Sequence, residues 1–199
     1  IYLVNQQRHD DGLRVWNTLN TDEKKANRHV GDSIVASLVT TKRYLDAMKL
    51  WNDIVPNERY RVEVGKVFDG SFEDAINYGP EMAFAWQVKG AQQLQIGIDP
   101  TKSNGGARSL RLVFQVRANL EGINISELIP VEGNSDYDFE YYFTTENLET
   151  GSAPMVQVLD ATDGAILATS PQAPSGSTPW ASAAANAGKR SGFFRQSSA

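Results

Sequence analysis

Residues 137–144 read YDFEYYFT, and this stretch decides the fold class of the second half of the chain. Aromatic residues stand at positions 137, 139, 141 and 143, while Asp138, Glu140, Tyr142 and Thr144 stand between them. Successive side chains of a strand point to opposite faces of a sheet, so this alternation predicts a strand with one buried and one solvated face. A sheet with one solvated face is typical of antiparallel folds.

Further short strands are predicted on both sides of this one. Apolar residues alternate over residues 60–68, 84–88, 94–98, 110–116, 123–125 and 156–158, and again at Ile166 and Ala168. Turn sequences such as Asp69-Gly70 and Asp163-Gly164 separate these runs. Many short strands separated by turns predict an antiparallel β-sandwich.

The last thirty residues differ in composition from the rest of the chain. Residues 170–179 are rich in Pro, Ser and Gly, and residues 181–188 are mostly small. We expect a flexible loop, one strand near Trp180 and a poorly ordered polar tail.

The first sixty residues have the periodicity of helices. Leu13, Trp16 and Leu19 fall three residues apart, which stacks them on one helix face. Trp51 belongs to a later segment of the same kind, and we expect Trp16 and Trp51 to lie inside a helical bundle of about residues 8–55.

Local signals mark the ends of these helices. Asn20, three residues before Glu23, predicts a capping box at the start of one helix. Thr41 is predicted to cap the next helix, which should end before Pro56. The chain is therefore divided into a helical segment, residues 1–60, and a β-sandwich with a polar C-terminal tail, residues 61–199.

Composition narrows the classes of function. The net charge is −5 and the pI is about 5.1, which disfavours nucleic acid as a partner. No apolar run approaches the ~20 residues of a membrane-spanning helix. The chain has no cysteine, so disulfides and thiolate chemistry are excluded, although the compartment is not fixed by this.

Residues for catalysis are few. His9 and His29 are the only histidines, and both lie in the helical segment. No nucleophile elbow or phosphate-binding loop is present, since Gly105-Gly106 precedes a predicted strand and indicates a hairpin turn. The chain is therefore predicted not to be an enzyme.

Five short motifs follow one another between about residues 67 and 180. They are FDGSFE at 68–73, FAW at 84–86, GARSLRL at 106–112, PVEG at 130–133 before Tyr137, and VLDA at 158–161. Together they resemble carbohydrate-binding modules that have the galactose-binding-like jelly roll. The helical start resembles the end of a tetratricopeptide-type helix array.

The resemblance implies a mainly β fold, an antiparallel jelly-roll β-sandwich behind a short N-terminal helical bundle. Two departures are visible. Asp69 stands where such modules have Asn, and the apolar strand that closes the sandwich falls either in residues 192–195 or nowhere, which would leave an open edge.

In such modules the sugar lies against exposed rings, while amides and carboxylates bind its hydroxyls. Trp180 and Tyr78 are the predicted loop aromatics of the site. The outward residues of two strands complete the candidate ligand-binding set, which is Trp180, Tyr78, Tyr142, Glu140, Gln115 and Arg111. The alternative is a solvated sheet face in which Arg111 and Glu140 form a cross-strand charge pair. Phe84 and Trp86 are predicted to lie in the core.

Glu73 matches a position where the family often has a structural calcium ligand, and Asp69 and Asp74 are near it in sequence. The alternative is an exposed acidic turn. The expected function is a non-catalytic binding module for carbohydrate within a larger protein. The alternative function is a structural or protein-interaction domain without a small-molecule ligand.

Overall fold

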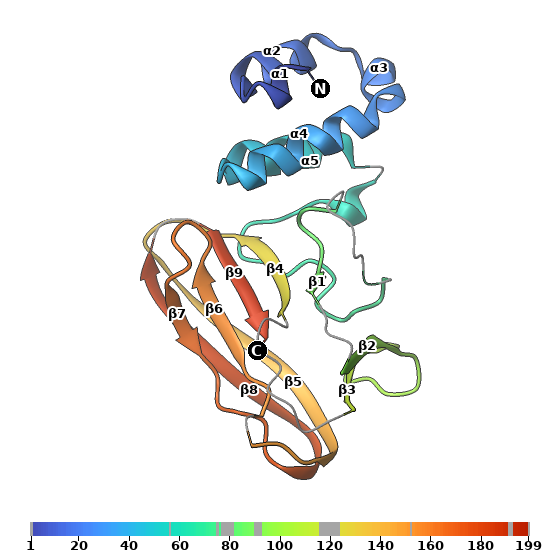
Figure 1. Ribbon diagram of the computed structural model, residues 1–199, viewed down its shortest axis with the longest axis vertical. Helices are drawn as coiled ribbons and strands as arrows, with labels where there is room; N and C mark the ends of the chain where they lie inside the picture. The colour runs from blue at the N-terminus through green and yellow to red at the C-terminus, as the bar shows by residue number, and fades with distance from the viewer. Residues whose placement is uncertain are drawn as a thin grey trace.

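The computed structural model describes residues 2–55, 57–74, 76, 82–89, 93–115, 124–151, 153–190 and 193–198. Helices form the N-terminal part and small antiparallel sheets form the rest (Figure 1). The helices are α1 Tyr2–Asn5, α2 His9–Thr18, α3 Thr21–Ala26, α4 Arg28–Thr40 and α5 Tyr44–Ile54, followed by the 3-10 turn Glu58–Tyr60. Among the described helices, none is both long enough and apolar enough to cross a bilayer.

The capping box at Asn20 is confirmed. The Asn20 side chain accepts hydrogen bonds from the backbone N–H groups of Asp22 and Glu23, both at 3.0 Å, and the Glu23 carboxylate accepts from the Asn20 N–H at 2.8 Å. These bonds satisfy N–H groups that the start of α3 leaves without intrahelical partners.

The prediction that Thr41 caps α5 is wrong, because Thr41 ends α4 instead. Lys42 has a φ of 61°, its N–H donates to the Val39 carbonyl at 3.0 Å, and the Arg43 N–H donates to the Leu38 carbonyl at 2.8 Å. This is a Schellman motif, in which the left-handed residue reverses the chain directly after the helix. The chain then enters α5 without a side-chain cap.

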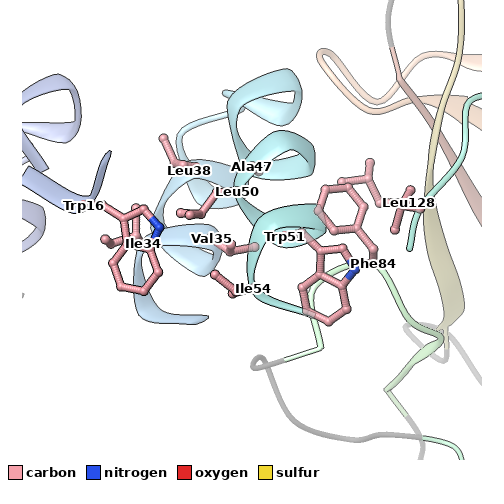
Figure 2. Packing of buried hydrophobic residues seen from close by; sticks show 11 residues of the cluster. Trp16, Ile34, Val35, Leu38, Ala47, Leu50, Trp51, Ile54, Phe84 and Leu128 are labelled. Carbon is pink, nitrogen blue, oxygen red and sulfur yellow. The ribbon is translucent and has the colours of Figure 1, made fainter. Parts of the chain in front are cut away.

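One apolar cluster fills the helical part. Trp16 and Trp51 are both buried in it, as predicted, with Ile34, Leu38 and Leu50 between them (Figure 2). The cluster extends beyond the helices to Phe84 and to Leu128 of the strand β4 (Asn124–Pro130), so helices and strands share this core.

Hydrogen bonds also join the helical part to the strand-rich part. The Asn52 side chain forms two hydrogen bonds with the Val62 backbone, at 2.8 and 3.0 Å. The Tyr44 hydroxyl donates to the Ala161 carbonyl at 2.7 Å, and the Trp51 indole N–H donates to the Tyr60 carbonyl at 2.8 Å. The polar atoms of α5 thus bind backbone groups of the strand-rich part.

Three antiparallel sheets are described. The first has the order β1-β4-β9-β6-β7, the second is the hairpin β2-β3, and the third is the long ribbon β5-β8. The strands are β1 Gln87–Lys89, β2 Leu94–Asp99, β3 Ser109–Phe114, β4 Asn124–Pro130, β5 Ser135–Leu148, β6 Val156–Asp160, β7 Ile166–Thr169, β8 Gly176–Arg190 and β9 Phe193–Ser198. The chain is therefore strand-rich with a helical start. Strands are present within the ranges predicted at 94–98, 110–116, 137–144 and 156–158 and at Ile166 and Ala168, although Val116 lies outside the described residues.

The expected disorder at the C-terminus is wrong, because this segment forms β8 and β9. Along β8, Ala181, Ala183 and Ala185 lie opposite Phe143, Tyr141 and Phe139 of β5. Small side chains leave room for the rings, so the partner strand supplies the apolar surface that β8 lacks. β9 lies between β4 and β6, so a strand is present where the closing strand was expected, and it is central in its sheet rather than at an open edge.

No strand forms over residues 60–68, contrary to expectation, because the described chain there makes turns. Gly65, inside this range, has a φ of 73°, which a strand does not allow, and Asp69 and Phe72 just after it have φ values of 48° and 56°. Residues 84–86 also precede β1 rather than belong to it, and Pro56 and Ile123 lie outside the described residues.

β4 is buried on both faces, since Ile125 to Pro130 are all buried, including the polar Ser126 and Glu127. Leu128 packs into the helical cluster, whereas Ile129 packs with Val158 of β6 and Ala185 of β8. Glu127 is the only charged residue of this strand, and its side chain is buried as well.

Candidate functional site

A cavity of about 260 Å³ lies in the connection between α5 and β1. Its walls come from two stretches of chain, residues 60–76 and residues 82–86. The described lining residues are mostly aromatic or apolar and include two carboxylates: Tyr60, Phe68, Asp69, Phe72, Asp74, Ile76, Met82, Ala85 and Trp86. Such a mixture is typical of small-molecule sites.

The aromatic rings of the cavity form two pairs. The ring centroids of Tyr60 and Phe68 lie 6.2 Å apart, and those of Phe72 and Trp86 lie 5.0 Å apart, with 32° between the planes in each pair. Trp86 is only 7% exposed, and its indole N–H donates to the Asp69 carbonyl at 3.3 Å. The rings are therefore held in place by packing and by the turn beside them.

Asp69 shapes that turn. One carboxylate oxygen accepts from the Glu73 N–H at 2.7 Å and the other from the Asp74 N–H at 2.9 Å. The Phe72 N–H donates to the Asp69 carbonyl at 2.9 Å, which closes the turn. Asp tolerates the left-handed conformation and bonds to nearby backbone, so the Asp69-Gly70 sequence suits this position and brings Phe68 and Phe72 to one cavity.

The charges at the cavity do not balance. The Arg59 guanidinium donates to the Asp74 carboxylate at 2.6 Å and lies 5.9 Å from the Tyr60 ring centroid. Burial raises the pKa of the Asp69 carboxyl and the nearby Asp74 charge raises it further, while backbone hydrogen bonds and Arg59 oppose this shift. With both carboxylates ionised, two negative charges face one guanidinium.

A third acid, Glu127 of β4, lies behind the turn. It is 2% exposed, and one of its carboxyl oxygens accepts a hydrogen bond from the Phe68 N–H. Burial raises the pKa of Glu127 to about 9 against the opposing bond from Phe68, and the charge of Asp69 adds to the rise. Near neutral pH Glu127 is therefore protonated, and it positions the backbone of a cavity residue.

Glu73 connects the turn to the β2-β3 hairpin. Its carboxylate accepts from the Ala107 N–H at 2.7 Å, and its carbonyl accepts from the Arg108 guanidinium at 3.3 Å. Within the described ranges, no group of three or more acidic or histidine side chains is placed to hold a metal ion. The calcium assignment for Glu73 stays a prediction.

Of the predicted ligand residues that the structure describes, none lines this cavity. Glu140 and Tyr142 are on the solvated face of β5, where Tyr142 is 54% exposed. Arg111 and Gln115 lie in and just after β3 on a separate sheet. Tyr78 lies outside the described residues. The described members of the predicted set are therefore not gathered at the cavity.

Two details of those predictions need correction. Trp180 lies within β8, in agreement with the strand expected near it, but it is half-buried and is not a loop aromatic. The pKa of Glu146 is lowered chiefly by Lys102, 2.8 Å away, and to a lesser degree by Arg111. Arg111 lies on β3 and Glu140 on β5, strands of two different sheets, so the two do not form the cross-strand charge pair that was the alternative.

It was not predicted from the sequence that these aromatic side chains meet at one cavity. Phe84 and Trp86 are both buried, as predicted, but Phe84 packs on Trp51 whereas Trp86 packs on Phe72. The signal was present in the acidic and aromatic run FDGSFED at residues 68–74. That run alone does not show that Tyr60 and Trp86 lie next to its residues in the folded chain.

No protein-family model matches the chain, and no curated protein is significantly similar to it in sequence. The interpretation of the cavity therefore rests on its geometry.

Proposed function

We propose that the chain is a non-catalytic binding module for carbohydrate within a larger protein, and that the cavity beside Asp69 is its sugar site. The observation that carries this proposal is that two ring pairs and two carboxylates line one cavity. Ring faces suit the C–H surface of a pyranose, and carboxylate oxygens accept hydrogen bonds from hydroxyls.

The hydrogen bonding of the acids favours binding over catalysis. Both oxygens of Asp69 accept backbone N–H groups, and Asp74 accepts from Arg59. The Asp69 carboxylate holds a turn together and the Asp74 carboxylate binds Arg59, which are different tasks from exchanging protons with a substrate.

We further propose that the strand-rich part is a jelly roll. The sheet containing β4 and β6 and the ribbon β5-β8 contribute side chains to one apolar cluster, which supports two facing layers. All the described strand pairs are antiparallel, as the proposal requires.

Affinity electrophoresis through soluble polysaccharides tests the function. We expect at least one polysaccharide to retard the full chain and the variant Tyr60→Leu, which keeps apolar bulk but removes the ring, to lose the retardation. Tyr142→Ala on the β5 face is the matched control and should be retarded like the wild type. Loss in Tyr142→Ala with retention in Tyr60→Leu would move the site to the face predicted from the sequence, and no retardation by any polysaccharide would overturn the proposal.

A structural or protein-interaction role is the second candidate. Large apolar side chains are exposed on the helices, namely Tyr2, Val15 and Leu45. Co-purification of one defined partner, lost in Leu45→Asp, together with no polysaccharide binding, would favour this role.

A further inference from the structure

We propose that the sugar bound in the cavity carries a positive charge, as the protonated amine of an unacetylated hexosamine. This inference rests on the proposed function and names the chemical class of its ligand. Of the described residues that line the cavity, none is basic, and the guanidinium of Arg59, which lies over the ring of the lining residue Tyr60, is bound to Asp74. The walls therefore offer acceptors and ring faces to a ligand.

The aromatic walls favour a cation. The face of an aromatic ring carries partial negative charge and attracts an ammonium or guanidinium within about 6 Å. The chain itself supplies an example, because the Arg59 guanidinium lies 5.9 Å from the Tyr60 ring centroid. Three further rings, those of Phe68, Phe72 and Trp86, line the same cavity.

The carboxylates favour a cation for a second reason. Asp69 and Asp74 lie close enough for the charge of one to disfavour ionisation of the other, and Asp69 is partly desolvated. A ligand ammonium would offset the excess negative charge, whereas a neutral hydroxyl would only accept or donate a hydrogen bond. A ligand carboxylate would add to the repulsion.

The cavity volume limits how much of a glycan can enter. About 260 Å³ is slightly below the range of about 300–1,000 Å³ typical of pockets for drug-sized ligands. We therefore infer that one hexosamine ring enters the cavity and that the rest of the glycan stays outside.

Calorimetric titration of the full chain with three matched trisaccharides tests the inference. They are the β-1,4-linked trimers of glucosamine, of N-acetylglucosamine and of glucose, which share a backbone and differ at carbon 2. We expect the glucosamine trimer to bind at least about tenfold more tightly than the other two. In Asp74→Asn this preference should fall to within about threefold, while Tyr60→Leu should weaken all three ligands.

Asp136→Asn is the control for charge, because it removes one carboxylate from the exposed face of β5. It should leave the preference unchanged. If Asp136→Asn lowers the affinity for the glucosamine trimer as much as Asp74→Asn does, the binding is a general attraction to an acidic protein and the inference is wrong. Thermal melts of each variant show whether it is folded.

The outcomes separate the inference from the function on which it rests. Equal or tighter binding of a neutral trimer, still lost in Tyr60→Leu, would overturn the positive charge and keep the sugar site. Absence of binding by all three trimers and of retardation by every polysaccharide would overturn both.

Discussion

The rings of Trp51 and Phe84 lie with their centroids 5.9 Å apart and their planes tilted by 58°. Both side chains are buried, and Leu128 of β4 completes the contact (Figure 2). Trp51 belongs to α5 and Phe84 to the segment before β1, so this pair joins the helical part to the strands. Two residues further along, Trp86 packs on Phe72 at the cavity, and the same short segment therefore belongs to both the core and the site.

Trp51 and Phe84 should be coupled in stability. Trp51→Leu and Phe84→Leu should each lower the free energy of unfolding by about 1–3 kcal/mol, and the double variant should show a coupling energy of about 1 kcal/mol. Urea titrations of the two single variants and the double variant measure these free energies. Trp16→Leu with Phe84→Leu is the control pair, since Trp16 lies at the far end of the cluster and its effect should be additive (Figure 2). Additive effects for Trp51 and Phe84 would contradict the shared core.

Glu127 should make stability fall as pH rises. Between the ordinary pKa of 4.5 and the folded-state value of about 9, the folded chain holds a proton that the unfolded chain has released. Its contribution is therefore fully present below about pH 4.5 and is lost as pH rises through about 9, with a slope of at most about 1.4 kcal/mol per pH unit. Glu127→Gln should remove this slope, so its stability advantage over the wild type should grow between about pH 5 and pH 9.

Urea midpoints at several pH values measure this difference. Glu132→Gln, which changes an exposed carboxyl close by, should follow the pH dependence of the wild type. Parallel curves for Glu127→Gln and the wild type would show that Glu127 is not held as the neutral acid.

β9 should be essential to its sheet, since it pairs with β4 on one side and β6 on the other. Arg195 lies opposite Leu128 and Leu159, and Arg195→Pro removes a backbone N–H from the centre of the sheet. We expect a loss of about 2 kcal/mol or more in the free energy of unfolding. Arg195→Ala keeps the N–H and should cost much less, so equal losses in the two variants would contradict a central β9.

Glu73 should stabilise the connection to the β2-β3 hairpin through the Ala107 N–H. Glu73→Ala should cost about 1 kcal/mol, whereas Glu73→Gln keeps an acceptor oxygen and should retain most of the stability. The same variants test the calcium prediction. A calcium-dependent rise in the Tm of the wild type that both variants lose would support it, and a Tm that calcium leaves unchanged would contradict it.

Short-range patterns determined several elements from the sequence alone. The alternation at residues 137–144 predicted β5, and the pair Asn20 and Glu23 predicted the start of α3, because both signals depend on residues a few positions apart. Trp16 and Trp51 were predicted to be buried because large aromatics at helical spacing pack together. These signals require no knowledge of distant segments.

Only the tertiary structure decided how far β8 extends beyond the strand expected near Trp180, where β9 pairs, and which residues form the cavity. The alanines of β8 carry no strand signal of their own, and they form a strand because Phe139, Tyr141 and Phe143 lie opposite them. The cavity needs Tyr60, Phe72 and Trp86 in one place, which depends on left-handed turns and on the bond from the Phe68 N–H to Glu127, 59 residues away. The protonation of Glu127 has the same origin: a carboxyl in a strand sequence becomes a neutral acid only when packing on both faces of the strand removes it from water.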